Sequence, residues 1–144
     1  MATTNTYLTF NGNCEKAFDF YKSVFGGEFT YIGRFGEMPA SEDYTVSDSD
    51  KNKVMHVSLP IGTSVLMGSD CGGDWAPSFV QGNNFSVSVS AATKAEADQI
   101  FKALAVGGKI TMPLENTFWG DYFGMLTDQF NINWMMSFDE KSKS

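Results

Sequence analysis

The two halves of this 144-residue chain repeat one succession of residue patterns, so its fold must be one that can be built twice. An acid, a phenylalanine and a glycine pair recur 81 positions later: Glu15, Phe20 and Gly26-Gly27 as Glu96, Phe101 and Gly107-Gly108. A methionine and an aspartate recur 69 positions later: Met67 and Asp70 as Met136 and Asp139. The offsets differ by 12, which predicts about twelve additional residues between the second and third strands of the first half.

Each half is predicted to fold as a strand, a helix and three further strands. Alternating apolar and polar residues indicate first strands at 7–10 and 85–90. Apolar residues at helical spacing then indicate helices at 14–25 and 94–104, each ending near a glycine pair. The remaining predicted strands lie at 29–32, 54–59, 64–69, 109–112, 122–127 and 132–138. We therefore predict an α+β fold in which two βαβββ modules form a curled mixed sheet around a cavity, with the helices on its outer face.

The length predicts a single domain over residues 1–144. Within it, module one covers about 5–70, a linker about 71–82, and module two about 83–139. The additional residues of the first half fall in the loop 36–52, which carries five acids and one lysine. This loop is interpreted as a solvated surface loop or, alternatively, as a lid over the cavity.

Charge and composition exclude several classes of partner. Ten Lys and Arg against seventeen Asp and Glu give a formal net charge of −7. Nucleic acids and anionic membranes require clustered cations, so neither is expected as a partner. Two cysteines outside any Cys-x-x-Cys pair do not make a disulfide framework. Without a long apolar run or a secretion signal, the chain is expected to be cytoplasmic.

Strand alternation assigns side chains to the two faces of the predicted sheet. On the first strand of each half, the cavity-side residues are Tyr7, Thr9, Ser86 and Ser88. On the strand at 54–59, the same alternation places His56 on the cavity side with Val54 and Ser58. The offset of 69 makes Met125 the counterpart of His56, and makes Leu66 and Met135 a matched cavity-side pair.

Several stretches carry a family resemblance: 11–21 with 25–27, 55–57, 66–70, 119–124 and 128–135. Together they resemble the PhnB-like proteins, also described as 3-demethylubiquinone-9 3-methyltransferase-like, of the vicinal oxygen chelate superfamily. That superfamily includes glyoxalases, bleomycin resistance proteins and extradiol dioxygenases. The resemblance covers nearly the whole chain and implies the paired βαβββ fold and a homodimer. Asn131 departs from the glycine that is usual in this family, although asparagine also tolerates left-handed backbone.

The resemblance also implies where a metal would bind, namely on His or Glu side chains from the first and last strand of each half. In this chain those strands are 5–10, 63–69, 83–91 and 132–138, and none contains His, Asp, Glu or Cys. Metal ions require such donors. We therefore predict no metal site and no cofactor, and expect no metal-dependent isomerisation, dioxygenation or fosfomycin opening.

His56 is the chain's one histidine and the candidate acid–base residue, because imidazole exchanges protons readily near neutral pH. Alternatively, it is a hydrogen-bonded strand residue with a structural role. Cys71 lies several positions beyond the expected cross-strand neighbour of His56, which argues against a Cys–His nucleophile pair. Cys14 lies on the apolar face of the first predicted helix and is expected in the core.

Aromatic residues make up 15% of the chain, and several gather around the linker and the loop near position 120. They are Trp75, Phe79, Trp119, Tyr122 and Phe123. Such residues pack in a core or a dimer interface, or line an apolar ligand pocket. The predicted ligand-binding set is Tyr7, Thr9, Ser58, Ser86, Ser88, Trp119, Phe123, Met125 and Met135.

Three functions remain open from the residues. The leading hypothesis is a metal-free protein that binds a small, partly aromatic or apolar molecule in the sheet cavity. The second is a metal-independent enzyme of the superfamily that uses His56, and the third is a dimeric scaffold without a ligand. The methyltransferase description gains no support, because the chain has no glycine-rich segment suited to S-adenosylmethionine.

Overall fold

The computed structural model describes residues 2–37, 47–72 and 77–139. The chain separates into two compact units that divide between Val80 and Gln81, and each is described by itself. We keep the term module for the βαβββ part of each unit.

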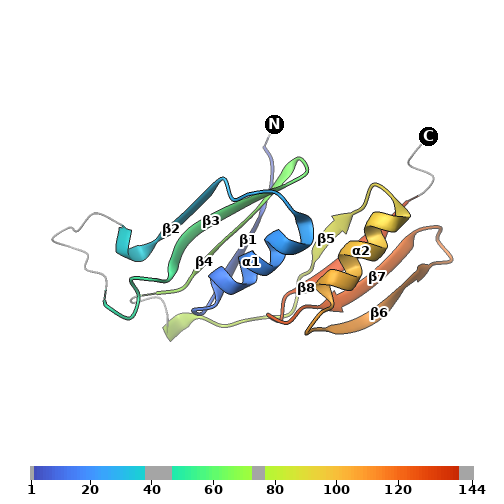
Figure 1. Cartoon of the computed structure of the whole chain (residues 1–144). Coiled ribbons are helices and arrows are strands. Elements are labelled where there is room, and N and C mark those ends of the chain that lie inside the picture. The colour runs from blue at the N-terminus through green and yellow to red at the C-terminus, as the bar shows by residue number, and fades with distance from the viewer. Residues whose placement is uncertain (1, 38–46, 73–76, 140–144) are drawn as a thin grey trace. The chain divides into compact units, whose positions relative to one another are not determined.

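The first module is a four-stranded mixed sheet with one helix (Figure 1). Its elements are β1 (Thr6–Phe10), α1 (Cys14–Phe25), β2 (Tyr31–Arg34), the 3₁₀ helix η1 (Phe35–Glu37), β3 (Val54–Ile61) and β4 (Ser64–Asp70). The strand order is β1-β4-β3-β2. β1 runs parallel to β4, and the other neighbouring pairs are antiparallel.

The second module repeats this plan with the order β5-β8-β7-β6. Its elements are β5 (Val87–Ser90), α2 (Lys94–Leu104), β6 (Lys109–Asn116), β7 (Tyr122–Thr127) and β8 (Asn133–Phe138). β5 is parallel to β8, and the other neighbouring pairs are antiparallel. The predicted α+β fold of two βαβββ modules is therefore confirmed.

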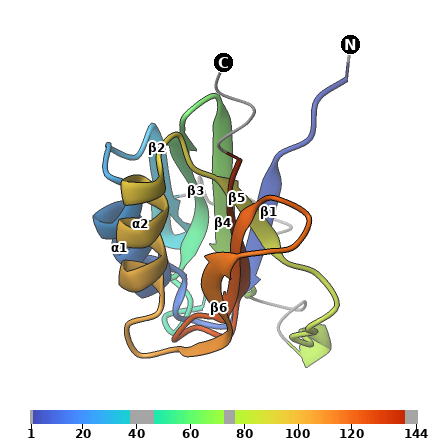
Figure 2. The same ribbon diagram turned by 90° about the vertical axis from the view of Figure 1, so that its right-hand side faces the viewer.

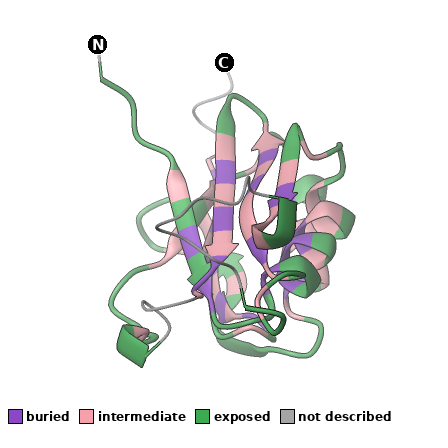
Figure 3. Ribbon diagram, turned by 90° about the vertical axis from the view of Figure 1, so that its left-hand side faces the viewer, coloured by how far each residue is buried: buried purple, intermediate pink, exposed green. Residues whose placement is uncertain are grey.

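In each module the helix lies on one side of its own sheet (Figures 1 and 2). The apolar face of α1 buries Cys14, Ala17, Phe18 and Tyr21 against that sheet, and α2 buries Ala97, Phe101 and Leu104. Buried residues accordingly alternate with more exposed ones along the strands (Figure 3). The face of each sheet opposite its helix is called here the open face.

Glycine permits the close approach of α1 to its sheet. A Cβ added to Gly68 would lie 2.5 Å from the Phe18 ring and 2.8 Å from the Leu8 carbonyl oxygen. Real Cβ atoms do not approach other atoms so closely, so the ring of Phe18 occupies the space that a side chain at position 68 would need. Gly124 has the same role beneath Phe101 in the second module.

A buried aspartate connects elements of the first module through hydrogen bonds. Asp70 is 4% exposed and accepts backbone N–H groups from Gly12, Cys14 and Val54, each at 2.9 Å. Its carboxylate thereby joins the start of α1 to the first residue of β3. A buried carboxylate is stable only when such donors surround it, and Asp70 has three of them.

The predicted face of Val54 is wrong. Val54 was expected on the open face with His56, yet it is buried, with 1% of its surface exposed. The reason is a bulge between β2 and β3, where Gly33 pairs with His56 but Arg34 pairs with Val54. Met55 is therefore an extra residue, and the alternation shifts by one position before His56.

The repeat offset of 69 is also wrong by one or two positions. Val57 pairs with Gly68, eleven positions on, whereas Gly124 pairs with Met136, twelve positions on. Between equivalent strand positions, the β7–β8 hairpin thus contains one residue more than the β3–β4 hairpin. By register, the counterpart of His56 is Phe123 rather than Met125. Leu66 is buried on the helix side and does not match Met135.

No helix within the described ranges has both the length and the apolar character needed to cross a bilayer.

Candidate functional site

The sole histidine lies on the open face of the first sheet, between two hydroxyl groups. The Nε2 atom of His56 is 2.9 Å from Oγ of Ser58, two residues along the same strand. Its Nδ1 atom is 3.5 Å from the Tyr7 hydroxyl on β1. A neutral imidazole donates through one nitrogen and accepts through the other, so both hydroxyl contacts fit a single tautomer.

Two tyrosine rings flank this imidazole. The ring centroid of Tyr7 lies 5.7 Å from that of His56, and the two ring planes meet at 37°. The ring centroid of Tyr31 lies 5.9 Å from that of His56, with an angle of 43° between the planes. Tyr31 has this position because Gly33, two residues further along β2, carries no side chain: a Cβ on Gly33 would collide with the Tyr31 hydroxyl. Tyr7 and Tyr31 remain 46% and 50% exposed. We call Tyr7, Tyr31, His56 and Ser58 the tyrosine–histidine cluster.

The sheet register brings the cluster together from residues far apart in sequence. Met67 on β4 pairs with Tyr7 on one side and with Ser58 on the other. Ser58 in turn pairs with Tyr31 on β2. Because paired residues point to the same face, the four strands present Tyr7, Met67, Ser58 and Tyr31 in one row. Thr9 follows Tyr7 on the same face of β1, opposite Ser69.

The predicted residues of the second module form a separate row on its own open face. Ser88 pairs with Met135, and Met135 pairs with Met125. Phe123 lies two residues before Met125 on that face, and its ring centroid is 6.0 Å from that of the half-exposed Trp119. Ser86 directly precedes β5 and shares the parity of Ser88. All six predicted residues of this module therefore lie on one face or at its margin.

The two rows occupy equivalent positions but differ chemically. Tyr7, Ser58 and Met67 correspond by register to Ser88, Met125 and Met135. The imidazole of His56 is replaced by the phenyl ring of Phe123. The first row thus presents hydroxyls beside an imidazole, whereas the second offers thioether and phenyl surface.

The two cysteines do not contribute a nucleophile. Cys14 is fully buried, and its burial, followed by the charge of Asp70, raises the pKa of the thiol far above its usual value. The thiol therefore stays protonated, as expected for a core cysteine. Cys71 is buried as well and donates its S–H to Oδ1 of Asn11 at 3.4 Å.

Among residues 2–37, 47–72 and 77–139, no three His, Cys, Asp or Glu side chains gather closely enough to hold a metal ion. The buried carboxylates of this part of the chain, Asp70 and Asp128, are occupied by N–H donors. That the protein functions without a metal stays a prediction.

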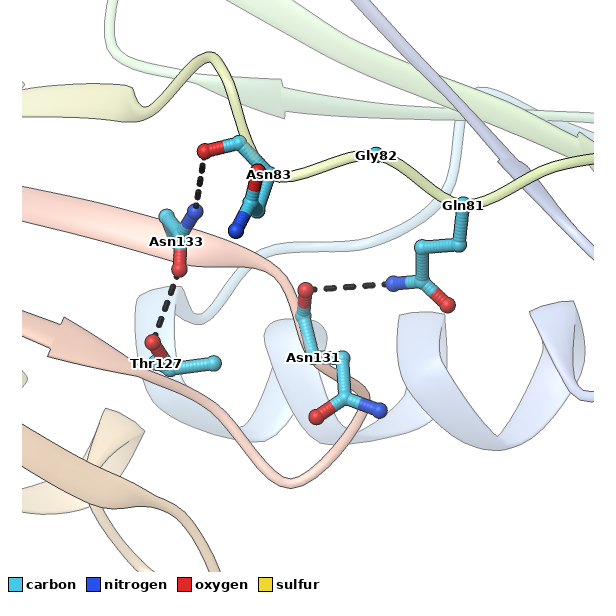
Figure 4. Close-up of a pocket in the computed structure, with 6 residues that line it drawn as sticks. All are labelled: Gln81, Gly82, Asn83, Thr127, Asn131 and Asn133. Atoms are coloured by element: carbon cyan, nitrogen blue, oxygen red, sulfur yellow. Dashed lines mark hydrogen bonds between the residues drawn. The ribbon is translucent and has the colours of Figure 1, made fainter.

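The second unit contains a polar pocket of about 580 Å³ that the sequence did not predict. It is lined by Gln81, Gly82, Asn83, Thr127, Asn131 and Asn133. Figure 4 shows the segment 81–83 along one rim and the β7–β8 turn with its flanking residues along the other. The amide-rich run 81–84 is the one sequence feature that could have indicated this pocket. The sequence alone does not show that this run lies beside Asn131 and Asn133 in the folded chain.

Two further predictions concern residues that the structure does not describe. Trp75 lies outside the described residues, and so do residues 38–46 of the loop proposed as a lid. Phe79 is described and is half-buried.

Comparison with known proteins adds the family context. Residues 2–137 match the family model described as 3-demethylubiquinone-9 3-methyltransferase. Protein YjdN of Escherichia coli K12 is 31% identical over 137 residues, which are 91% of each chain. Protein PA1353 of Pseudomonas aeruginosa is 37% identical, with a TM-score of 0.80 over 96% of this chain and 98% of that one.

Other solved structures extend the likeness. The PhnB protein from Bacillus cereus is 26% identical, with a TM-score of 0.72 over 95% of this chain and 99% of its own. A glyoxalase/bleomycin resistance protein/dioxygenase family enzyme from Burkholderia phytofirmans shares the fold with 16% identity. Its TM-score is 0.60 over 94% of this chain and 98% of its own.

Proposed function

This chain belongs to the 3-demethylubiquinone-9 3-methyltransferase family of PhnB-like proteins, within the vicinal oxygen chelate superfamily, and from that premise we propose that it is a small-molecule binding protein. The proposed ligand is a planar, partly aromatic molecule held on the tyrosine–histidine cluster. The family resemblance seen in the sequence is confirmed. The family's name does not itself supply a reaction for this chain.

The observation that carries the proposal is the arrangement of three rings on one open face. Tyr7 and Tyr31 stand on either side of His56, with centroids within 6 Å of the imidazole, and about half of each tyrosine is exposed. Exposed rings of this kind can stack on a planar ligand, which contributes roughly 0.5–1.5 kcal/mol per ring pair beyond the area buried. Rings with hydroxyl groups at their ends are also typical of pockets that fix a ligand's orientation.

The hydrogen-bonding groups of the cluster favour a neutral ligand. Tyr7, Tyr31 and Ser58 offer hydroxyls, and His56 offers a donor and an acceptor. None of the four is a permanent cation, so an anionic ligand would lack a counter-charge among them. A phenol, a quinone or a similar hydroxylated or carbonyl-bearing ring fits these groups.

The row Ser88, Met125 and Met135, with Ser86, Phe123 and Trp119 near it, is kept as a second proposed contact surface for an apolar group. Thioethers and aromatic rings adapt well to flat apolar ligands. Single alanine substitutions at Met125 and Phe123 test it separately from the cluster.

The homodimer that the family resemblance implies is likewise a proposal, and sedimentation equilibrium tests it.

A metal-independent enzyme is the second candidate function. It is favoured by the position of the imidazole between the hydroxyls of Ser58 and Tyr7, because such an imidazole can accept a proton from one partner while donating to another. The substitution His56→Ala separates the candidates. A binding protein loses one contact and roughly tenfold or less in affinity, whereas an enzyme loses roughly 10²–10⁴-fold in turnover.

The experiment that tests binding uses the single histidine as its probe. Planar phenols, quinones and aromatic drugs are screened by thermal shift, and compounds that stabilise the protein are titrated while the His56 imidazole signals are followed by NMR. We expect saturable shifts of these signals, and weaker binding in Tyr31→Ala.

The matched control is Phe118→Ala, which removes a ring that is 98% exposed and lies outside the cluster. Binding that is unchanged in Tyr31→Ala, or a stabilising compound that leaves the imidazole signals unmoved, would contradict the proposed site. A panel in which no compound stabilises the protein would favour the scaffold hypothesis.

A further inference from the structure

We propose that the polar pocket of the second unit is a binding site for a neutral saccharide or polyol. This site consists of other residues, with other chemistry, than the tyrosine–histidine cluster. The proposal can therefore be tested independently of the function proposed above. Its volume of about 580 Å³ lies within the roughly 300–1,000 Å³ that is usual for small-molecule pockets.

The lining residues determine the class of ligand. Four of the six carry carboxamides, one carries a hydroxyl and one is glycine. No lining residue is charged, which disfavours phosphate and carboxylate ligands. No lining residue is aromatic, which disfavours nucleobases that bind by stacking. A carboxamide offers a donor and an acceptor side by side, and this pair matches adjacent hydroxyls on a sugar ring.

Hydrogen bonds join the two rims of the pocket. The amide of Asn133 donates to the carbonyl oxygens of Asn83 and Phe85, both at 3.3 Å, and its Oδ1 accepts the Thr127 hydroxyl at 2.7 Å (Figure 4). Nε2 of Gln81 donates to the carbonyls of Phe130 and Asn131 at 3.2 and 3.1 Å. The segment 81–83 is thus tied to the turn that faces it.

Other polar groups of the pocket remain available. Within the described part of the chain, the side chains of Asn83 and Asn131 make no hydrogen bond, and both residues are exposed. The hydrogen bonds between the rims therefore hold the backbone on which these two carboxamides stand, one on each rim, and their donors and acceptors can bind a ligand.

The backbone of Asn131 supports the assignment and also supplies its test. Asn131 has a φ of +65°, the left-handed conformation in which glycine is the least strained residue. The chain nevertheless carries there a side chain that lines the pocket. The variant Asn131→Gly removes this carboxamide while keeping the backbone conformation, so it isolates binding from folding.

The experiment titrates ¹⁵N-labelled full-length protein with glucose, galactose, mannose, maltose and lactose, each up to its solubility. We expect saturable shifts of the side-chain NH₂ signals of Asn83 and Asn131 with at least one sugar. Losing one hydrogen bond weakens binding by roughly fivefold, which is the expected effect of Asn131→Gly and of Asn83→Ala. Asn116→Ala is the matched control, because it removes an exposed carboxamide of the same module outside the pocket.

Three results would overturn the proposal. The first is that no sugar moves the two NH₂ signals. The second is that Asn116→Ala weakens binding as much as the pocket variants do. The third is that glucose 6-phosphate binds more tightly than glucose, since a pocket without charged lining cannot favour the phosphate. Melting temperatures of all variants verify that each one is folded.

Discussion

The indole of Trp134 donates its N–H to the buried carboxylate of Asp128 over 2.8 Å. The same carboxylate accepts the backbone N–H groups of Phe130 and Ile132, at 2.7 and 3.0 Å. Asp128 thus ties the β7–β8 turn to the largest buried side chain of the second module. A network that satisfies every member in a buried site rigidifies the elements it joins.

Replacing this aspartate should therefore destabilise the protein strongly. In Asp128→Ala, two buried donors and one part-buried donor lose their acceptor, and we expect the free energy of unfolding to fall by about 3 kcal/mol or more. Trp134→Phe leaves the two backbone donors paired and should cost less than Asp128→Ala. Urea unfolding measures both. A loss below about 1 kcal/mol for Asp128→Ala would contradict this role.

Gly68→Ala tests the close packing of α1 on its sheet. The added Cβ would meet both the ring of Phe18 and the backbone carbonyl of Leu8, and the carbonyl cannot move aside without disturbing β1. Overpacking of this kind costs roughly 1–3 kcal/mol. Gly72→Ala is the control, since its Cβ would meet neighbours at an ordinary 3.5 Å. Equal melting temperatures for the two variants would refute the steric argument.

The ion pair between Glu15 and Arg34 should make stability depend on pH. Nη1 and Nη2 of Arg34 donate to the two carboxylate oxygens of Glu15, at 3.1 and 2.6 Å, and join α1 to β2. These bonds hold the pKa of Glu15 below its usual value. The stabilisation is therefore complete at neutral pH, and it is lost as the pH falls below roughly 4.3, the usual glutamate value, and through the lowered pKa.

Because the pair is partly exposed, solvent screening limits this contribution to below about 1 kcal/mol. Glu15→Gln should remove it, so that the wild type is the more stable at pH 7 and the difference shrinks as the pH falls through the lowered pKa of Glu15. Urea midpoints across this range measure the difference. A difference that persists at the acidic end would indicate a role other than the ion pair.

Thiol labelling provides a further test. The raised pKa and complete burial of Cys14 should leave it unreactive toward a disulfide reagent at pH 8 in the folded protein. A Cys71→Ser variant isolates this thiol, and we expect its labelling to begin only when urea unfolds the chain. Rapid labelling without denaturant would contradict the assignment of Cys14 to the core.

The order of elements was predictable because each one carries a local signal. Helical spacing between Cys14 and Phe25 and strand alternation before them are properties of neighbouring residues, and the structure reproduces both elements. The face of His56 was also correct, since Ser58 accompanies it on the open face. Alternation failed at Val54, because a bulge is set by pairing with β2 and leaves no mark on the strand's own pattern.

The contacts within the site were less predictable than the fold. Tyr31 joins His56 only because Gly33 leaves space for its ring, and this depends on register between strands. The saccharide pocket was missed for a related reason, because Gln81 and Asn131 are 50 positions apart and meet only through a turn. Equating His56 with Met125 failed by two positions. One came from matching Met67 with Met136, whereas by register Met67 corresponds to Met135, and the other from the one additional residue in the β7–β8 hairpin.

The corrected register has a practical consequence for protein engineering. Position 123 lies on its sheet as position 56 lies on the other, with Met125 and Met135 where Ser58 and Met67 stand. The substitutions Phe123→His and Met125→Ser would therefore place an imidazole–hydroxyl pair like that of His56 and Ser58 on the open face of the second module, without any change of backbone. The chain is in this sense two copies of one scaffold, of which one copy carries a histidine on its open face.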